Sequence, residues 1–367
     1  MNLRKYAIVA MACACLSMTA CGKSNPTGEA DTLPTDVVAI TEAPTTTEAP
    51  TVNTQEEQPV LEKAGMLRSI TTGEWVDEEV AKRRPLCIMI NNIEDAIPQS
   101  GIDHAEIIYE AYVESQITRL MIVMQNYDGL EKIGPVRSCR EFYVYYAYEF
   151  GGIYTHFGFS PLAASLLDRV EHIDGMKLDG SDFYRTTDRV APHNAYTSTK
   201  GLLNAASRYN FDLDLDDDVE TTFQFTQYDT KEIEFENGMD CTLFKPGFVR
   251  NKPEFRYNES DGLYYRWQYG EEHVDMESGE QLAFKNIIVR FVTGDKYSNG
   301  TPLLNNQGEG EGYYITNGKL CPIHWMKVDE LGPVKYTYSD GSDVILNQGK
   351  TFVNIINVDD LEDVYFE

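Results

Sequence analysis

Three arginines close together in the sequence are the side chains best suited to chemistry with a ligand. Arg119 begins a predicted strand, and Arg137 and Arg140 stand at the start of a predicted helix. A guanidinium group binds phosphate or carboxylate through two parallel hydrogen bonds, and free N–H groups at a helix start also attract negative charge. Because the chain has a formal net charge of -28, this group of residues reverses the local sign of charge. The pattern predicts an anion-binding site.

Other polar residues are predicted to complete this site. Loops at the carboxyl ends of strands are where α/β sheets bind ligands, so polar residues at those positions are candidates. Arg189 would add positive charge, and either histidine of the set could act as a general base. The predicted ligand-binding residues are Asn91, Glu110, Arg119, Arg137, Ser138, Arg140, His156, Ser160, Arg185, His193 and Asn194.

The same residues also have a structural explanation. The arginines could pair with nearby acids in internal salt bridges. Those acids are Glu110, Glu114, Glu141 and Asp188. Ser160 precedes a proline and fits the N-cap of a helix, and a histidine at a strand end is often a hydrogen-bonded structural group. At the level of sequence both explanations stay open.

The sequence lacks the motifs of common hydrolases and metalloenzymes. It contains no HExxH, no GxSxG, no pair of histidines at helical spacing and no Cys/His pattern typical of zinc. Neither a cofactor nor a bound metal is therefore predicted, and binding is favoured over enzymatic activity. Cys87, Cys139, Cys241 and Cys321 are expected to be buried free thiols, although their even number also permits disulfides.

The first residues have the features of a bacterial lipoprotein signal. Tyr6 to Leu16 is an apolar stretch that is too short to span a membrane. Met18-Thr19-Ala20-Cys21 resembles a lipobox, in which the cysteine is lipidated and becomes the first residue. A diacylglyceryl anchor holds firmly because each buried methylene contributes ~0.8 kcal/mol. Residues 1–20 are thus predicted to be the signal peptide, with Cys21 lipidated on the extracytoplasmic face of the cell membrane.

Composition divides the rest of the chain into a linker and two folded regions. Residues 21–66 are dominated by Thr, Glu, Pro and Ala, so a disordered linker is predicted. Residues 67–215 and 221–367 are the predicted domains, on either side of the acidic run Asp212–Glu220. The excess of Asp+Glu 59 over Lys+Arg 31 makes nucleic acid and anionic lipid surfaces poor partners.

The region 67–215 alternates strands with helices. Leu86 to Ile90 is a continuous apolar run, which is typical of a strand covered on both faces. Further strands are predicted over 107–113, 120–124 and 153–156, and helices over 138–150, 161–170 and from Thr197 or Ser198 to Tyr209. This order predicts an α/β domain with a mixed or mostly parallel sheet and flanking helices.

The region 221–367 has a different pattern. Short alternating segments separated by turns such as Asn237-Gly predict a smaller, antiparallel β-rich domain. Its predicted strands are 263–269, 285–292, 313–315 and 351–358. Gly308-Glu-Gly-Glu-Gly312 precedes no predicted helix and carries carboxylates where a phosphate would bind, so a turn is expected there.

Several segments resemble the signature of the YerB-like bacterial lipoproteins. They are Asn91, Pro98-Gln-Ser-Gly101, Tyr109-Glu110, Glu114, Ile117-Thr-Arg119, Ile133-Gly-Pro-Val-Arg-Ser138, Arg140 and His193-Asn194. The resemblance runs from about Arg83 to the C-terminus and is most specific in the GPVRS segment. It implies an extracytoplasmic lipoprotein with an N-terminal domain of unknown function and a smaller C-terminal one. It supplies no enzymatic activity.

These observations predict a membrane-anchored lipoprotein that binds an anionic cell-envelope component, or a protein partner, through an arginine-lined cleft. The alternative is a magnesium-dependent phosphotransferase acting on cell-wall precursors, with Glu110, Glu114 and Asp188 as metal ligands. That alternative depends on a similarity in outline to wall-polymer ligases of the LytR-CpsA-Psr type. A third interpretation makes the arginines purely architectural and the C-terminal domain a docking surface.

Overall fold

The computed structural model describes residues 62–217, 219–298 and 300–367. All of them lie in one compact unit, Val38–Glu367. The predicted signal peptide, the predicted lipidation at Cys21 and the predicted linker as far as residue 61 lie outside the described residues. Below, residues 62–217 are the N-terminal half and residues 219–367 the C-terminal half.

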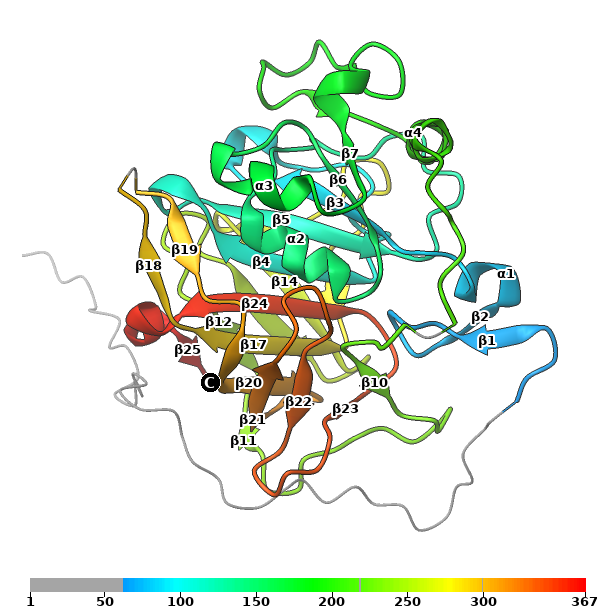
Figure 1. Ribbon diagram of the computed structural model, residues 1–367. Coiled ribbons are helices and arrows are strands. Elements are labelled where there is room, and N and C mark those ends of the chain that lie inside the picture. Colours follow the sequence, from blue (N-terminus) through cyan, green and yellow to red (C-terminus); the bar gives the residue numbers. More distant parts are fainter. Residues whose placement is uncertain (1–61, 218, 299) are drawn as a thin grey trace, which may run out of the picture. The chain divides into compact units, whose positions relative to one another are not determined.

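An 11-stranded mixed sheet runs through both halves (Figure 1). From edge to edge the strand order is β11-β21-β20-β17-β24-β4-β5-β3-β6-β7, and β22 also pairs with β21. The N-terminal half contributes β3 (Leu86–Asn91), β4 (Ile107–Tyr112), β5 (Thr118–Met124), β6 (Ile153–His156) and β7 (His172–Asp174). The C-terminal half contributes β11 (Met239–Asp240), β17 (Asn286–Val292), β20 (Gly308–Thr316), β21 (Lys319–Lys327), β22 (Lys335–Thr337) and β24 (Thr351–Asn357).

The two halves share the sheet because β24 lies between them. β24 pairs in parallel with β17 on one side and with β4 on the other, so Asn354 stands between Val289 and Glu110. The sequence predicted an α/β domain followed by an antiparallel one. The structure agrees only in outline, with a mixed sheet and two halves of different pattern: it is strand-rich with few helices, and its C-terminal half, although mostly antiparallel, includes two parallel pairs, β17–β24 and β10–β23.

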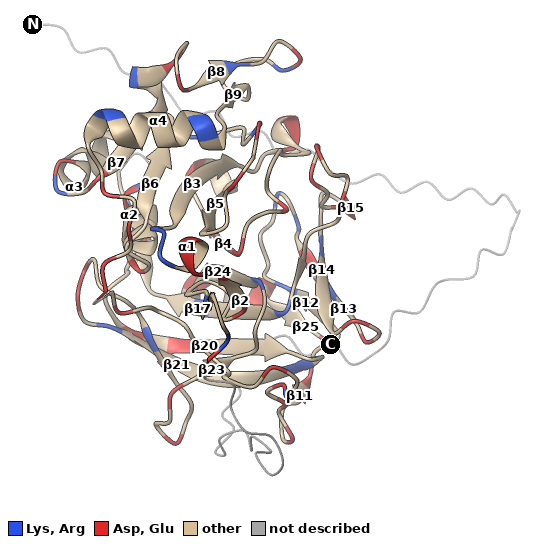
Figure 2. Ribbon diagram, turned by 90° about the vertical axis from the view of Figure 1, so that its right-hand side faces the viewer, with Lys and Arg blue, Asp and Glu red and all other residues tan. Residues whose placement is uncertain are grey.

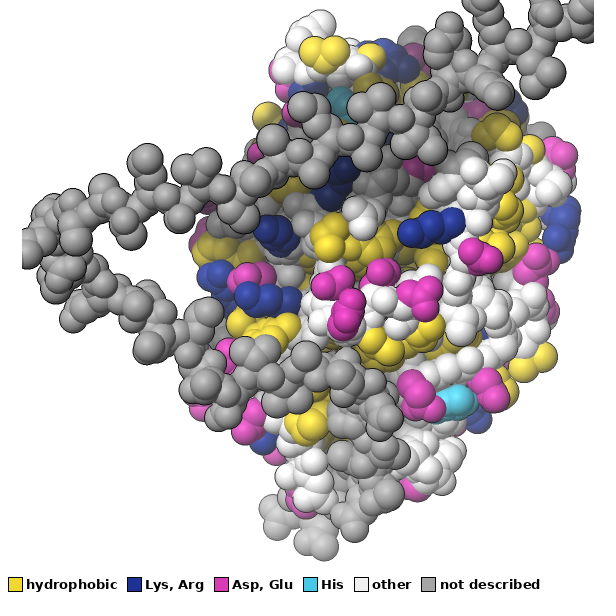
Figure 3. Space-filling model, turned by 90° about the vertical axis from the view of Figure 1, so that its left-hand side faces the viewer, with side chains coloured by type: hydrophobic (Ala, Val, Ile, Leu, Met, Phe, Trp, Pro, Cys, Tyr) yellow, Lys and Arg dark blue, Asp and Glu magenta, His cyan; other side chains and the backbone are white. Residues whose placement is uncertain are grey.

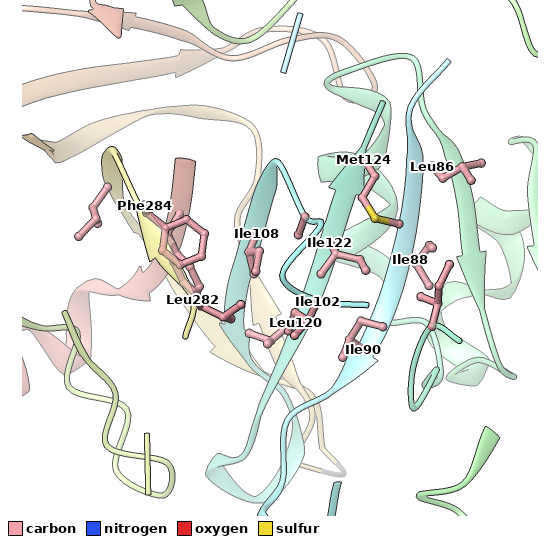
Figure 4. Close-up of a cluster of buried hydrophobic side chains, with 14 of the residues drawn as sticks. Leu86, Ile88, Ile90, Ile102, Ile108, Leu120, Ile122, Met124, Leu282 and Phe284 are labelled. Atoms are coloured by element: carbon pink, nitrogen blue, oxygen red, sulfur yellow. The ribbon is translucent and has the colours of Figure 1, made fainter. Parts of the chain in front are cut away.

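A second, antiparallel sheet covers one face of the large sheet. It consists of β12 (Leu243–Lys245), β13 (Glu254–Asn258), β14 (Leu263–Gln268), β15 (Glu271–Glu272), β16 (Ala283–Phe284) and β25 (Tyr365–Phe366). Phe255 and Phe284 pack with Ile108 of β4 and Phe352 of β24 in one hydrophobic core. Figure 4 shows Phe284 and Leu282 beside Ile108, across the boundary between the two halves. The burial of these side chains joins the halves into one unit.

Helix α2 (Glu141–Tyr148) packs on the opposite face of the large sheet. Its aromatic residues Phe142 and Tyr146 are buried with Tyr109 of β4 and Met121 of β5. Tyr109 and Tyr146 stack with their ring centroids 5.0 Å apart. Because residues alternate between faces along a strand, Tyr109 faces α2, whereas the neighbouring Glu110 faces the second sheet.

The other helices are α1 (Glu78–Ala81), α3 (Ala164–Leu167) and α4 (Thr199–Tyr209). Ser198 caps α4, since its hydroxyl accepts a hydrogen bond from the Gly201 N–H at 3.1 Å. Figure 2 shows basic positions on α4 and acidic positions spread over many of the loops. The three predicted helices are all present. The one capped by Ser198 ends at Tyr209 as expected, whereas 138–150 is reduced to α2, and 161–170 to the 3-10 turn η3 (Pro161–Ala163) followed by α3.

Short elements complete the described chain. Two-stranded pairs are formed by β1 (Met66–Arg68) with β2 (Trp75–Asp77), β8 (Tyr184–Arg185) with β9 (Ala195–Tyr196), β10 (Gln224–Phe225) with β23 (Ile345–Leu346), and β18 (Gly294–Lys296) with β19 (Pro302–Leu304). Further 3-10 turns are η1 (Glu94–Ala96), η2 (Glu114–Gln116), η4 (Gly175–Leu178) and η5 (Val358–Asp363).

The expectation of a turn at Gly308–Gly312 was wrong, because these residues begin β20. Gly312 needs to lack a side chain there, since a Cβ atom would lie 2.2 Å from the Val289 carbonyl oxygen of the next strand. At Gly310 a Cβ atom would lie 2.8 Å from the indole nitrogen of Trp325. Glycine therefore permits close approach of neighbouring groups in the sheet, rather than a reversal of the chain.

Candidate functional site

The arginine cluster consists of Arg119, Arg137 and Arg140. Arg119 leaves β5 on the α2 face, is only 3% exposed, and donates a hydrogen bond to the Ser138 carbonyl oxygen. Arg137 donates to the Pro192 carbonyl oxygen at 3.4 Å, and its buried Nε has no hydrogen-bond partner among residues 62–217, 219–298 and 300–367. Among the described residues, only Arg140 of the three forms a salt bridge, which it makes with Glu114.

The cluster contains more positive than negative charge. Arg140 binds Glu114 through two parallel hydrogen bonds, of 2.6 Å from Nε and 2.7 Å from Nη2. Burial, followed by the neighbouring Arg140 and Arg137, lowers the pKa of Arg119 to about 9. Burial and Arg140 likewise lower the pKa of Arg137. Glu114 thus pairs with one of three guanidinium groups, and the mutual repulsion of the three lowers the pKa values of Arg119 and Arg137.

The backbone around the cluster is held between two strands. The Asn91 N–H donates to the Pro135 carbonyl oxygen, and the Arg137 N–H donates to that of Met89, both at 2.9 Å. On the other side, the Phe157 N–H donates to the Arg137 carbonyl oxygen at 2.9 Å. The Ser138 hydroxyl donates to the Phe157 carbonyl oxygen at 3.1 Å. Residues 135–139 therefore run between the end of β3 and the loop after β6, which fixes the direction of the arginines.

The loop between β8 and β9 brings further predicted residues to the edge of the cluster. The Nδ2 atom of Asn91 lies 2.8 Å from Nδ1 of His193. Burial and Arg137 lower the pKa of His193, so the imidazole beside the cluster is held toward its neutral form. Arg189 donates two hydrogen bonds of 2.5 Å to the carbonyl oxygens of Ala96 and Pro98, which fastens this loop to η1.

Arg185 is engaged elsewhere. Its Nε donates to Asp179 at 3.0 Å, its Nη1 donates to the Asn194 side chain at 3.0 Å, and its guanidinium lies over the ring of Phe157. Because Asp179 already balances its charge, Arg185 adds little positive potential to the arginine cluster.

His156 and Ser160 make structural contacts. His156 is fully buried, with Nδ1 2.8 Å from the Gly158 carbonyl oxygen and Nε2 2.9 Å from Nδ1 of His172. Burial and the adjacent His172 lower the pKa of His156 to about 4. The Ser160 hydroxyl accepts from the Leu162 N–H at 3.4 Å and caps η3. Both contacts match the structural explanation considered from the sequence.

Glu110 lies on the opposite face of the large sheet from Arg119. It is fully buried and forms a salt bridge of 2.7 Å with Arg266 of β14. Its other oxygen accepts hydrogen bonds from Asn92, Thr118 and Asn251, at 3.0, 2.7 and 2.7 Å. This set of residues, the Glu110 network, joins the two halves and is separate from the arginine cluster.

A second buried ionic network lies on the α2 face. Glu149, at the end of α2, accepts hydrogen bonds from Arg290 at 3.1 and 3.2 Å and from Lys327 at 3.3 Å. The Tyr109 hydroxyl donates to Glu149 at 2.7 Å, and Tyr336 lies 2.6 Å from Nη2 of Arg290. The side chains of Glu149, Arg290 and Lys327 have no exposed surface. This Glu149 network also joins the two halves.

The proposed magnesium ligands do not come together. Glu110 is enclosed with Arg266, Glu114 is bound to Arg140, and Asp188 is fully exposed on the β8–β9 loop. Within the described ranges, no group of three or more His, Cys, Asp or Glu side chains has an arrangement that could hold a metal ion. In the same part of the chain, no helix has both the length and the apolar composition needed to cross a bilayer.

Several cavities formed by the described residues lie away from the arginine cluster. Four of them, of about 540, 490, 630 and 320 Å³, are lined by other residues of the described chain. The first two share Glu232, Asp261 and Lys285. On the face shown in Figure 3, acidic and basic side chains stand next to one another among hydrophobic ones. None of these four cavities is lined by Arg119, Arg137 or Arg140.

Some important residues could not be found from the sequence. Arg266 is 156 residues from Glu110, and no local pattern connects the two. Gln99 was recognised only as part of a family motif, yet its side chain donates to the Asn91 carbonyl oxygen at 2.9 Å and lies 2.8 Å from His273. The motif residues near Pro98 therefore dock the N-terminal half onto the C-terminal half.

The thiols should be unreactive in the folded protein. Cys87, Cys139, Cys241 and Cys321 are free and buried, and burial raises the pKa of Cys139 to about 12 and that of Cys321 to about 11. Because the thiolate is the reactive form, we expect peptide mapping by mass spectrometry to find these four unmodified after iodoacetamide treatment of the native full chain. Denaturation before treatment should make all four react. Rapid native modification of Cys139 would contradict this prediction.

Known proteins resemble this chain over most of its length. Residues 71–212 match the family described as "Protein of unknown function (DUF3048) N-terminal domain", and residues 244–353 match its C-terminal domain. "Putative lipoprotein YerB" of Bacillus subtilis (strain 168) is 30% identical over 311 residues, which are 83% of this chain and 91% of that protein. The crystal structure of YerB protein from Bacillus subtilis has a TM-score of 0.72 and 28% identity, and the match covers 82% of this chain and 99% of that one. The chain therefore belongs to the YerB-like DUF3048 family.

Proposed function

We propose that this protein is a lipid-anchored lipoprotein on the extracytoplasmic face of the cell membrane that binds an anionic group through Arg119, Arg137 and Arg140. The observation that carries the proposal is the environment of Arg119. The residue is 3% exposed, and its guanidinium group donates to a carbonyl oxygen and lies beside two further guanidinium groups. Burying a cation in this way is costly unless a negative charge joins it.

The anchor is proposed from the N-terminal sequence. Met18-Thr19-Ala20-Cys21 has the form of a lipobox, and the related protein of Bacillus subtilis is named as a lipoprotein. Two acyl chains on Cys21 would hold the protein firmly on the membrane. A linker of the length and composition of residues 21–66 would allow the folded part to reach a target at a distance from the bilayer.

The ligand class is proposed from the donors that the site offers. Guanidinium groups with parallel N–H donors suit phosphate and carboxylate oxygens. Arg140 is also the N-cap residue of α2, and no side chain caps this helix, so the first N–H groups of α2 add to the positive potential. An anionic component of the cell envelope that carries such groups is the expected ligand. The phosphotransferase alternative has no comparable support, since Glu110 is enclosed with Arg266.

Arg137→Ala should weaken anion binding with little effect on stability. Its guanidinium makes one hydrogen bond of 3.4 Å, so its removal costs the fold little, whereas a charge-assisted pair with a ligand contributes about 1.5–3 kcal/mol. We expect titration calorimetry of the full chain in detergent to detect pyrophosphate binding, and the variant to lose at least about tenfold in affinity.

Arg208→Ala is the matched control for this experiment. It also removes one positive charge, but Arg208 lies on α4, where it pairs with Asp182 at 2.8 Å. The affinity of Arg208→Ala for pyrophosphate should equal that of the unchanged protein. Equal binding by the Arg137 and Arg208 variants would contradict the proposed site, and a fall of several degrees in the melting temperature of Arg137→Ala would support the architectural interpretation.

A further inference from the structure

Glu114 is the carboxylate that pairs with the arginine cluster, through Arg140. Both of its carboxylate oxygens accept hydrogen bonds from Arg140, at 2.6 and 2.7 Å, and Thr301 of the C-terminal half lies 3.4 Å from one of them. Its charge also acts on Arg119 and Arg137, since it raises the pKa of both while burial and the other arginines lower it. The carboxylate therefore stands where an incoming anion would meet the cluster.

The turn that carries Glu114 is strained. Ser115 and Gln116 follow it with φ of 61° and 56°, in the left-handed region that non-glycine residues rarely adopt. The turn is closed by a hydrogen bond of 2.8 Å from the Val113 N–H to the Ile117 carbonyl oxygen. Arg250 of the C-terminal half donates to the Ser115 carbonyl oxygen at 2.8 Å. Contacts from both halves thus hold a locally unfavourable backbone that directs Glu114 toward Arg140.

Glu114 remains accessible to water. Its side chain keeps 32% of its surface exposed, whereas that of Arg140 keeps 12%. A carboxylate with this exposure can move into solvent without being stranded in the interior, which distinguishes it from the fully buried Glu110 and Glu149. The arginine would remain in place with both parallel donors, Nε and Nη2, free.

We infer that Glu114 is a built-in competitor for the anion site, and that a ligand binds by displacing it from Arg140. This inference rests on the proposed function, because it assigns the regulation of the same site. Displacement would give the ligand the parallel donors of Arg140 in addition to Arg119 and Arg137. It would also make the site selective, because a single carboxylate gains nothing over the one already bound. An anion with two or more negative charges, such as a phosphate or pyrophosphate group, would bind Arg140 more strongly than the Glu114 carboxylate does.

Glu114→Gln should therefore bind pyrophosphate more tightly than the unchanged protein. The amide holds Arg140 less strongly than the carboxylate and no longer repels the ligand. We expect titration calorimetry of the full chain in detergent to show an affinity gain of about tenfold. Acetate, tested as a singly charged probe, should bind detectably only to the variant. Glu114→Asp keeps the charge but shortens the side chain. Its affinity for pyrophosphate should therefore lie between that of the unchanged protein and that of Glu114→Gln.

Glu141→Gln is the matched control. Glu141 lies in the first turn of α2, next to Arg140 in sequence, but its carboxylate accepts from the Tyr297 hydroxyl at 2.7 Å. Removal of this equal charge should change pyrophosphate affinity less than twofold, because the carboxylate does not occupy Arg140. A similar gain for Glu141→Gln would mean that only the net charge matters, and would overturn the inference.

The remaining outcomes separate the inference from the proposed function. If the unchanged protein binds pyrophosphate, Arg137→Ala loses that binding and Glu114→Gln binds no more tightly, the inference fails and the proposed site stands. If pyrophosphate binds neither to the unchanged protein nor to Glu114→Gln or Glu114→Asp, both fail. Circular dichroism of each variant shows whether it is folded. If Glu114→Gln is not folded, the pyrophosphate affinity of Glu114→Asp decides whether the inference holds.

Discussion

Arg266→Met should lower the free energy of unfolding by about 3–5 kcal/mol, because it leaves the Glu110 carboxylate buried without a counter-charge. Arg266 and Glu110 have no exposed side-chain surface, and 2.7 Å separates their paired atoms. The hydrogen bonds from Asn92, Thr118 and Asn251 remain in the variant, but they satisfy the other carboxylate oxygen. Urea unfolding of the full chain in detergent, followed by tryptophan fluorescence, measures the loss.

Arg169→Met tests whether burial causes this effect. Arg169 also pairs across the two halves, with Glu330 at 2.8 Å, but it keeps 56% of its side-chain surface exposed. Exposed pairs contribute about 0–1 kcal/mol, so the free energy of unfolding of this variant should be close to that of the unchanged protein. Adding Glu110→Gln to Arg266→Met should recover part of the stability, since the stranded charge is then gone. A loss below about 1 kcal/mol for Arg266→Met would contradict the prediction.

Glu149→Gln is expected to destabilise the protein by a similar amount, about 3–5 kcal/mol, for the opposite reason. It leaves two buried cations, Arg290 and Lys327, facing each other without the carboxylate that they share. The Tyr109 hydroxyl also loses a charged acceptor at 2.7 Å. Glu330→Gln is the control, because it removes a partly exposed carboxylate from the surface pair with Arg169. It should change the free energy of unfolding little.

The Glu149 network should also contribute to acid sensitivity. Burial alone would raise the pKa of Glu149, but Arg290 and Lys327 outweigh burial and bring it below the usual 4.5. A folded-state pKa below the unfolded one gives stability that is present above pH 4.5 and is lost as pH falls through the folded value. The free energy of unfolding of the unchanged protein should therefore fall more steeply with acid than that of Glu149→Gln. Parallel declines in urea titrations at several pH values would refute this.

The strands of the N-terminal half could be predicted because they are continuous apolar segments. The apolar runs Leu86–Ile90 and Leu120–Met124 became β3 and β5 almost residue for residue. The C-terminal segment Thr351–Val358 was likewise expected as a strand and became β24. The strands that pair with β24 could not be predicted, because its pairing with β4, more than 200 residues earlier in the chain, leaves no local sequence pattern. The sequence therefore predicted elements well and their assembly poorly.

The candidate site was predictable to the same extent. Arg119, Arg137 and Arg140 come together because the GPVRS segment runs between β3 and the loop after β6, close to the start of β5. Glu110 was assigned to the same site, but the alternation of side chains along β4 turns it to the other face. Glu114 reaches Arg140 only because the η2 turn reverses the chain. The pairing of each carboxylate with a particular arginine depends on such turns. The geometry of these turns cannot be predicted from composition.

The position of β24 has a consequence for the synthesis of the chain. Until Thr351–Asn357 has left the ribosome, β4 has no partner on one side, and its N–H and C=O groups are open to pairing with another chain. We therefore expect nascent molecules to be prone to aggregate until residues 351–357 emerge. We expect folding to benefit from chaperones that keep this strand edge covered, and premature termination before residue 351 to yield material that is degraded.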